Sequence, residues 1–172
     1  VKDSDYFRTA FNAVQDLIKK DLLLAGHDIS AGGLVTALLE MTFANTEGGL
    51  DINLDGVKCD DIVKILFAEN PGVVIQVADK KCGEVKKFLE DAGVSFIKLG
   101  KPCEERHILI EKDGSEYQLG IDYLRDVWYS TSYLLDKQQS FHGKAKERFE
   151  NYKQQPLEWN MLPGFTGKLG QY

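Results

Sequence analysis

Residues 27–34 have the sequence HDISAGGL and lie between a short apolar run, Leu22 to Ala25, and a strongly periodic segment that continues to about Ala44. The apolar run predicts a short strand, and the periodic segment predicts a helix. A carboxylate, a hydroxyl and two glycines therefore meet at a helix N-terminus, where unpaired backbone N–H groups and the helix dipole favour an anion. An aspartate there can also hold Mg²⁺, which takes hard oxygen ligands. The stretch points to nucleotide or phosphate chemistry.

Each polar residue of this stretch has a ligand-binding interpretation and a purely structural one. Asp28 can bind a metal and Ser30 can donate to a phosphate oxygen, while Gly32 and Gly33 let a phosphate approach the backbone. Alternatively, Ser30 caps the helix, Asp28 complements its dipole and the glycines shape a tight turn. His27 can serve as a phosphate donor or acid–base group, although a hydrogen-bonded structural histidine is commoner. Because capping is common and an isolated glycine motif is weak, the pattern alone favours the structural interpretation.

The rest of the sequence contains few candidate ligands. Glu69 stands in a turn before an apolar strand, where a carboxylate can hold a ligand or metal but is more commonly solvated. His107 and His142 have no accompanying motif. The three cysteines show neither a CxxC pair nor a His-spaced metal pattern, and their scatter suits a reducing compartment without disulfides; they are Cys59, Cys82 and Cys103.

Composition limits the class of protein. The 172 residues are 43% apolar and 28% charged, which predicts one soluble domain with a sizeable core. The net charge of −6 argues against a nucleic-acid partner. No apolar run reaches the roughly 18 residues of a membrane span. The chain starts at Val1 instead of a methionine, which suggests a piece of a longer protein or a processed one.

Hydrophobic periodicity predicts alternating helices and strands. The expected helices are 5–21, 34–44, 60–67, 80–92 and 121–135, and the expected strands are 22–25, 50–54, 73–77, 95–99, 107–111 and 116–119. In the first helix, one face is expected to be buried, and its residues are Tyr6 or Phe7, Ala10, Phe11, Val14, Leu17 and Ile18. The nearly continuous apolar strand 73–77 is expected to be covered on both faces.

The connections predict how these strands pair. Asp113-Gly114 is a strong signal for an antiparallel hairpin between the last two strands. The crossover helices imply some parallel pairing as well. We therefore expect an α/β (α+β) domain over residues 1–135, with a mixed β-sheet covered by helices. Residues 136–172 are expected to form a polar helix, at about 140–153, and then an extended linker.

Three blocks resemble one known family in the same order: residues 27–44, the segment LFAENPGVVIQV at 66–77, and the closing helix with LRDVW and TSY at 124–133. They resemble the last synthetase subdomain of formylglycinamide ribonucleotide amidotransferase, also called phosphoribosylformylglycinamidine synthase. The similarity extends over about residues 5–135. The polar tail resembles the connection to the glutaminase domain in the large single-chain form.

The resemblance implies a fold like the C-terminal domain of aminoimidazole ribonucleotide synthetase. It implies a cytoplasmic carbon–nitrogen ligase of purine biosynthesis, which converts formylglycinamide ribonucleotide, glutamine and ATP to formylglycinamidine ribonucleotide. By position, Asp28 would bind Mg²⁺ and Ser30 would contact ATP, with weaker claims for His27, Gly32 and Gly33. The partners would be the remaining synthetase and glutaminase domains of the same chain, the nucleotide and the ribonucleotide substrate. The resemblance reverses the preference for simple capping.

Two positions depart from the family pattern. Ala31 stands where many members have an acidic residue, and Asn70-Pro71 replaces a more usual Glu-Leu pair. Neither change affects Asp28 or Ser30. The fragment alone is expected to be inactive, and its site would serve either a retained structural nucleotide or a consumed one. Two alternatives are another ATP-using synthetase or kinase of the same superfamily, and a non-catalytic ligand-binding or assembly module.

Overall fold

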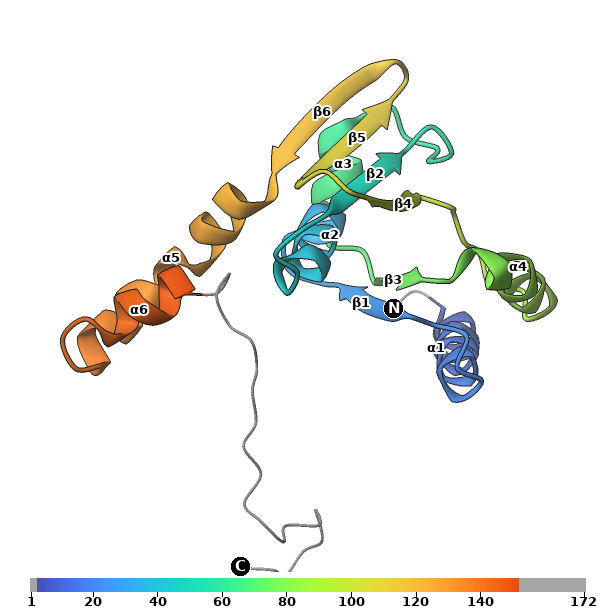
Figure 1. Cartoon of the computed structure of the whole chain (residues 1–172). Helices are drawn as coiled ribbons and strands as arrows, with labels where there is room; N and C mark the ends of the chain where they lie inside the picture. Colours follow the sequence, from blue (N-terminus) through green and yellow to red (C-terminus); the bar gives the residue numbers. More distant parts are fainter. Residues whose placement is uncertain (1–2, 152–172) are drawn as a thin grey trace, which may run out of the picture. The chain divides into compact units, whose positions relative to one another are not determined.

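The computed structural model describes residues 3–151, which divide between a first unit, Val1–Trp128, and a second unit, Tyr129–Tyr172 (Figure 1). The elements of the first unit are α1 (Ser4–Lys19), β1 (Ala25–Ile29), α2 (Gly33–Phe43), β2 (Gly49–Asn53), α3 (Ile62–Phe67), β3 (Gly72–Gln76), the 3₁₀ helix η1 (Asp79–Lys81), α4 (Cys82–Asp91), β4 (Gly100–Cys103), β5 (His107–Lys112), β6 (Ser115–Gly120) and the start of α5 (Ile121–Gln139). The second unit contains the rest of α5 and α6 (Lys144–Glu150).

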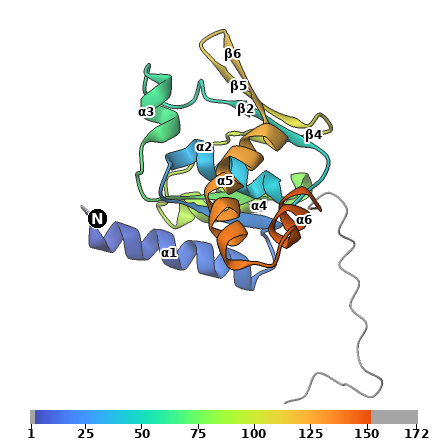
Figure 2. The ribbon, with the colours of Figure 1, turned by 90° about the vertical axis from the view of Figure 1, so that its left-hand side faces the viewer.

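The strands form two sheets. β1 pairs antiparallel with β3, and a four-stranded sheet has the order β4-β2-β5-β6. β2 and β5 are parallel, whereas the other neighbours in that sheet are antiparallel. Figure 2 shows the β5–β6 hairpin, which turns at Asp113 and Gly114 with positive φ at both residues, as an Asp-Gly turn requires. The mixed α+β class is confirmed, although the strands are shared between two sheets.

The main hydrophobic core lies around α2. Figure 1 shows α2 between the two-stranded sheet and the four-stranded sheet. The core residues come from α2, β2 and the residue that follows it, α3, β5 and the first position of α5, and they are Leu34, Val35, Leu38, Ile52, Leu54, Leu66, Ile108, Ile110 and Ile121. Partly buried side chains of β1 and β3, Ile29 and Val74, pack against it. This core fixes the end of β1 relative to the start of α2.

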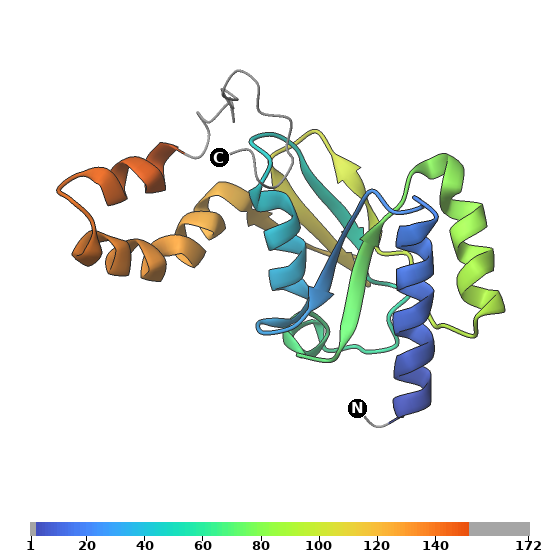
Figure 3. The ribbon, with the colours of Figure 1, turned by 90° about the horizontal axis from the view of Figure 1, so that it is seen from below.

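A second, smaller core joins α1 to α4, which lie side by side in Figure 3. Ala13 and Leu17 are its buried residues from α1, and Val85 and Leu89 are those from α4. The prediction that one apolar face of α1 is buried is therefore wrong in part: Leu17 is buried, but Phe7 and Phe11 are 49% and 55% exposed. The apolar side chains of α1 wrap around more than one face, and α4 covers only the side that carries Ala13 and Leu17.

Two strand positions and one burial prediction are wrong. The strand expected at 22–25 begins only at Ala25. The reason is that Leu22 is buried in the second core and its N–H donates to the carbonyl oxygen of Leu17, near the end of α1. The strand expected at 95–99 lies instead at β4, where Pro102 is tolerated because β4 is an edge strand. β3 is not covered on both faces, since Val73 is 49% exposed.

The second unit is held by aromatic and ionic contacts of its own. The rings of Tyr133 and Phe149 stack with centroids 4.7 Å apart, and Arg148 pairs with Asp136 at 2.6 Å. The polar helix expected at 140–153 is confirmed in position by α6, although α6 is shorter. The extended linker expected at 154–172 lies outside the described residues. Within residues 3–151, no helix has the length and apolarity needed to cross a membrane.

Candidate functional site

Asp28 and Ser30 lie at the end of β1, close to the start of α2. Asp28 is opposite Val73 of β3 in the antiparallel pair, and its side chain is 73% exposed. Ser30, which follows the strand, is exposed as well. Within residues 3–151 the Asp28 carboxylate accepts no hydrogen bond, and the His27 Nδ1 lies 3.8 Å from its Oδ1. Two oxygen-bearing side chains are therefore open to a ligand at this point.

The N-terminus of α2 is closed by a protein carboxylate. Gly32, with φ of 83°, occupies the N-cap position, and no side chain of the described residues caps the helix there, so the capping role considered for Ser30 is wrong. Instead, the Gly32 N–H donates to Glu69 Oε1 at 2.9 Å. The structure thus brings together two candidates that lie 37 residues apart, Glu69 and the glycine stretch. An acidic side chain already occupies the position where the helix terminus favours an anion.

Gly33 is required by a close backbone crossing. Its φ is +75°, and an added Cβ would lie 2.6 Å from the Leu66 carbonyl oxygen and 2.7 Å from the Phe67 carbonyl carbon. These atoms belong to the end of α3, so Gly33 lets α3 pack directly onto the start of α2. The turn that carries Glu69 follows from there. The glycines therefore have a clear packing role, while their contact with a phosphate remains a prediction.

His27 connects β1 to α2. Its Nε2 lies 3.1 Å from Glu40 Oε2, and its Nδ1 lies 2.7 Å from the Asp28 carbonyl oxygen. The side chains of His27 and Glu40 are 29% and 24% exposed. Both ring nitrogens therefore have protein partners, which matches the structural interpretation of this histidine. A phosphate contact by His27 stays a prediction and would have to replace one of these two partners.

The residues present fit part of a magnesium–nucleotide site. An exposed carboxylate without a hydrogen-bonded partner is a suitable Mg²⁺ ligand, and an adjacent hydroxyl can donate to a phosphate oxygen. Beside them, an open groove of about 480 Å³ runs between α1 and the two-stranded sheet, lined by His27, Asp28 and apolar side chains such as Val14 and Ile18. Because Mg²⁺ requires near-octahedral coordination, Asp28 and Ser30 are too few to complete the site alone.

A second group of polar side chains, which the sequence did not reveal, lies on the four-stranded sheet. Potential ligand atoms of Asp51, Cys103 and His107 all lie within 4.8 Å of one another. Burial and the nearby negative charge of Asp51 raise the pKa of the Cys103 thiol. These residues come from β2, β4 and β5, so no spacing along the sequence joins them. Only knowledge of the strand order and register would have identified them.

The comparisons with known proteins agree with this architecture. A mixed sheet packed with helices around a central α2 defines an α+β domain, and the same fold occurs in Thermotoga maritima PurL complexed with ATP. That structure has a TM-score of 0.60 and 15% identity, over 67% of this chain and 21% of that chain. Residues 1–111 match the model of the family "AIR synthase related protein, C-terminal domain". The chain belongs to this family.

Relatives with more similar sequences have different names. Human phosphoribosylformylglycinamidine synthase is 38% identical over 136 residues, which cover 76% of this chain and 10% of that protein. The major tegument protein of Epstein-Barr virus (strain AG876) is 38% identical over 98 residues, or 57% of this chain and 7% of that protein. The chain thus spans about a tenth or less of the length of these curated relatives.

Proposed function

We propose that this chain is one part of a phosphoribosylformylglycinamidine synthase, in which Asp28 binds Mg²⁺ and Ser30 contacts ATP. The longer protein would convert formylglycinamide ribonucleotide, glutamine and ATP to formylglycinamidine ribonucleotide. The similarity to the human protein of that name supports the reaction. The observation that carries the site is the exposed Asp28 carboxylate, which accepts no hydrogen bond within residues 3–151 and stands two residues before an exposed hydroxyl.

Each residue of the site would have a separate task. Asp28 would supply one oxygen ligand, and Ser30 would donate its hydroxyl proton to a phosphate oxygen. Glu69, by accepting the Gly32 N–H, would hold the loop before α2 in place. Bound Mg²⁺ would neutralise phosphate charge during transfer. The other metal ligands, the ribonucleotide contacts and the ammonia-producing glutaminase would come from the remainder of the longer protein, which we place in the cytoplasm.

A binding experiment on the 172-residue chain alone tests how much of the site this chain contains. Titration of the 172-residue chain with Mg·ATP in a calorimeter should show negligible affinity, because one carboxylate and one hydroxyl cannot hold a triphosphate. Micromolar binding that is unchanged by Asp28→Ala would contradict the assignment of Asp28.

Activity assays of variants of the longer protein test whether the reaction needs this site. There, Asp28→Asn should strongly reduce ATP- and glutamine-dependent product formation, whereas Asp91→Asn, at an exposed position ending α4, should leave it unchanged. A pulse of labelled ATP followed by an unlabelled chase would distinguish a consumed nucleotide from a retained one. Loss of retained label in the Asp28→Asn protein would assign the site to a structural nucleotide.

The similarity to a viral major tegument protein favours a second candidate, a non-catalytic binding or assembly module. That name describes a virion component and no reaction. The double variant Asp28→Asn, Ser30→Ala distinguishes the two candidates in the longer protein. Activity that survives both changes would favour the non-catalytic module, and its loss with an intact fold would favour the ligase.

A further inference from the structure

The group formed by Asp51, Cys103 and His107 is independent of the candidate nucleotide site. In the sheet register, Gly49 of β2 is opposite Cys103 of β4, and the parallel pairing places His107 of β5 on the other side of Gly49. Asp51 follows two residues later on β2 and therefore lies on the same face as Gly49. Three neighbouring strands thus each supply one potential ligand around a position that has no side chain.

Gly49 makes this arrangement possible. A Cβ at Gly49 would lie 1.9 Å from the His107 carbonyl oxygen and 2.5 Å from the Glu105 carbonyl oxygen. The backbone of residues 105–107 therefore takes the place of a side chain at Gly49. This close approach brings the residues before β5 against the start of β2, beside Cys103 of β4.

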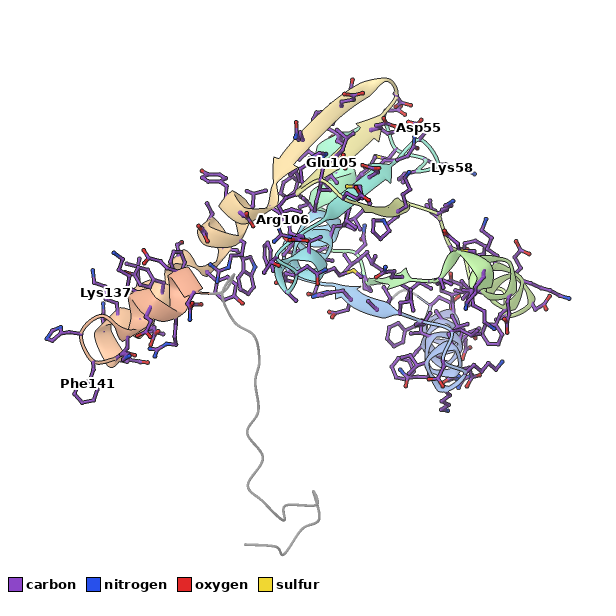
Figure 4. All side chains as sticks on the ribbon, in the orientation of Figure 1. Asp55, Lys58, Glu105, Arg106, Lys137 and Phe141 are labelled. Atoms are coloured by element: carbon purple, nitrogen blue, oxygen red, sulfur yellow. The ribbon has the colours of Figure 1, made fainter. Side chains whose placement is uncertain are left out.

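The turn that carries His107 is fixed by its neighbour Arg106, which Figure 4 labels together with Glu105. Arg106 Nε lies 3.0 Å from Asp122 Oδ1, and Nη1 donates to the carbonyl oxygens of Thr42 and Gly48. The Arg106 side chain is only 18% exposed. His107 therefore starts β5 from an anchored backbone.

The distances and the ligand types suit a transition metal. The three ligand atoms lie within 4.8 Å of one another, and all three residues are half-buried. Ligand atoms around a tetrahedral Zn²⁺ lie about 3.4–3.6 Å apart at ordinary bond lengths, so each side-chain tip would need to move by at most about 1 Å. Imidazole nitrogen, thiolate sulfur and a carboxylate oxygen are ligands that Zn²⁺ accepts, and three protein ligands leave a position for water.

We propose that Asp51, Cys103 and His107 bind one Zn²⁺ ion, which links β4, β2 and β5. The Cys103 thiol forms no disulfide, and its partners among the described residues are the Glu105 carbonyl oxygen, at 3.6 Å, and the side chain of Asp51, itself one of the proposed ligands. Binding releases the thiol proton to solvent, and the thiolate takes its place in the coordination shell. The ion would fasten β4, an edge strand of only four residues that contains Gly100 and Pro102.

Cobalt substitution tests the proposal directly on the metal-free 172-residue chain. One equivalent of Co²⁺ should give a thiolate-to-cobalt charge-transfer band, and one equivalent of Zn²⁺ should abolish it. Cys103→Ser should eliminate the band, whereas Cys59→Ser and Cys82→Ser, which change the other two cysteines of the chain, should retain it. Asp51→Asn and His107→Gln should each weaken Zn²⁺ binding at least tenfold, with His142→Gln as the unaffected control.

A second measurement guards against variants that fail to fold. In the unchanged chain, Zn²⁺ should slow alkylation of Cys103 at least tenfold and leave the rates of Cys59 and Cys82 unchanged, as peptide mass spectrometry would report. The absence of a charge-transfer band at one equivalent of Co²⁺, or equal protection of all three cysteines, would overturn the proposal. Neither result depends on nucleotide binding, so failure here leaves the proposed function unaffected.

Discussion

Gly33→Ala gives the sharpest test of how the candidate site is built. An alanine with φ near +75° costs about 1–2 kcal/mol, because the left-handed conformation brings Cβ against the backbone. Three backbone atoms of Leu66 and Phe67 would also lie 2.6–2.8 Å from the new Cβ. Forced displacement in a packed region typically costs about 1–3 kcal/mol more. The free energy of unfolding should therefore fall by about 2–5 kcal/mol in total.

Gly114→Ala is the matched control for this change. Gly114 has φ of +78° at the tip of the β5–β6 hairpin, and an added Cβ would meet no atom of residues 3–151 within 4 Å. Its substitution should cost only the conformational part, about 1–2 kcal/mol. Urea unfolding followed by circular dichroism gives both free energies. If Gly33→Ala destabilises the chain no more than Gly114→Ala does, the close crossing of α3 and α2 is refuted.

Three further predictions concern stability. Arg106→Ala should cost about 2–4 kcal/mol in urea unfolding, because it removes partly buried charged hydrogen bonds, whereas Arg8→Ala, which breaks an exposed pair, should cost under about 1 kcal/mol. Leu17→Ala should cost about 2–5 kcal/mol and Phe11→Ala under about 1 kcal/mol, since only Leu17 is fully buried. The Asp113 N–H donates to the Asp55 carboxylate and lowers the pKa of Asp55 below its ordinary 3.8. Above about pH 4 the unchanged chain should therefore have a larger free energy of unfolding than Asp55→Asn, and this difference should disappear as pH falls through the lowered pKa.

Local signals in the sequence predicted much of the fold. The helix expected at 34–44 corresponds to α2, whose buried side chains recur with helical spacing. The Asp113-Gly114 turn depends on two adjacent residues that tolerate positive φ, so it could be predicted from the dipeptide alone. These features need no information about distant parts of the chain.

Features that depend on contacts between distant residues could not be predicted in this way. β4 contains Gly100 and Pro102, which disfavour a strand, and it forms because the edge of β2 provides partners. The bond from Gly32 to Glu69 spans 37 residues. The group of Asp51, Cys103 and His107 requires the order of three strands. Sequence periodicity gives each segment's tendency, but these contacts depend on which segments become neighbours.

The contact between Gly32 and Glu69 changes the physical argument for nucleotide binding at this end of β1. A helix N-terminus attracts anions because its N–H groups lack partners. Here the Gly32 N–H is bonded to a carboxylate, and the Gly33 N–H donates to the Ser30 carbonyl at 3.1 Å. A phosphate at the helix terminus would have to displace Glu69 and would meet its negative charge. A cation held by Asp28 meets no such competition, so a metal ion there would attract phosphate without displacing Glu69.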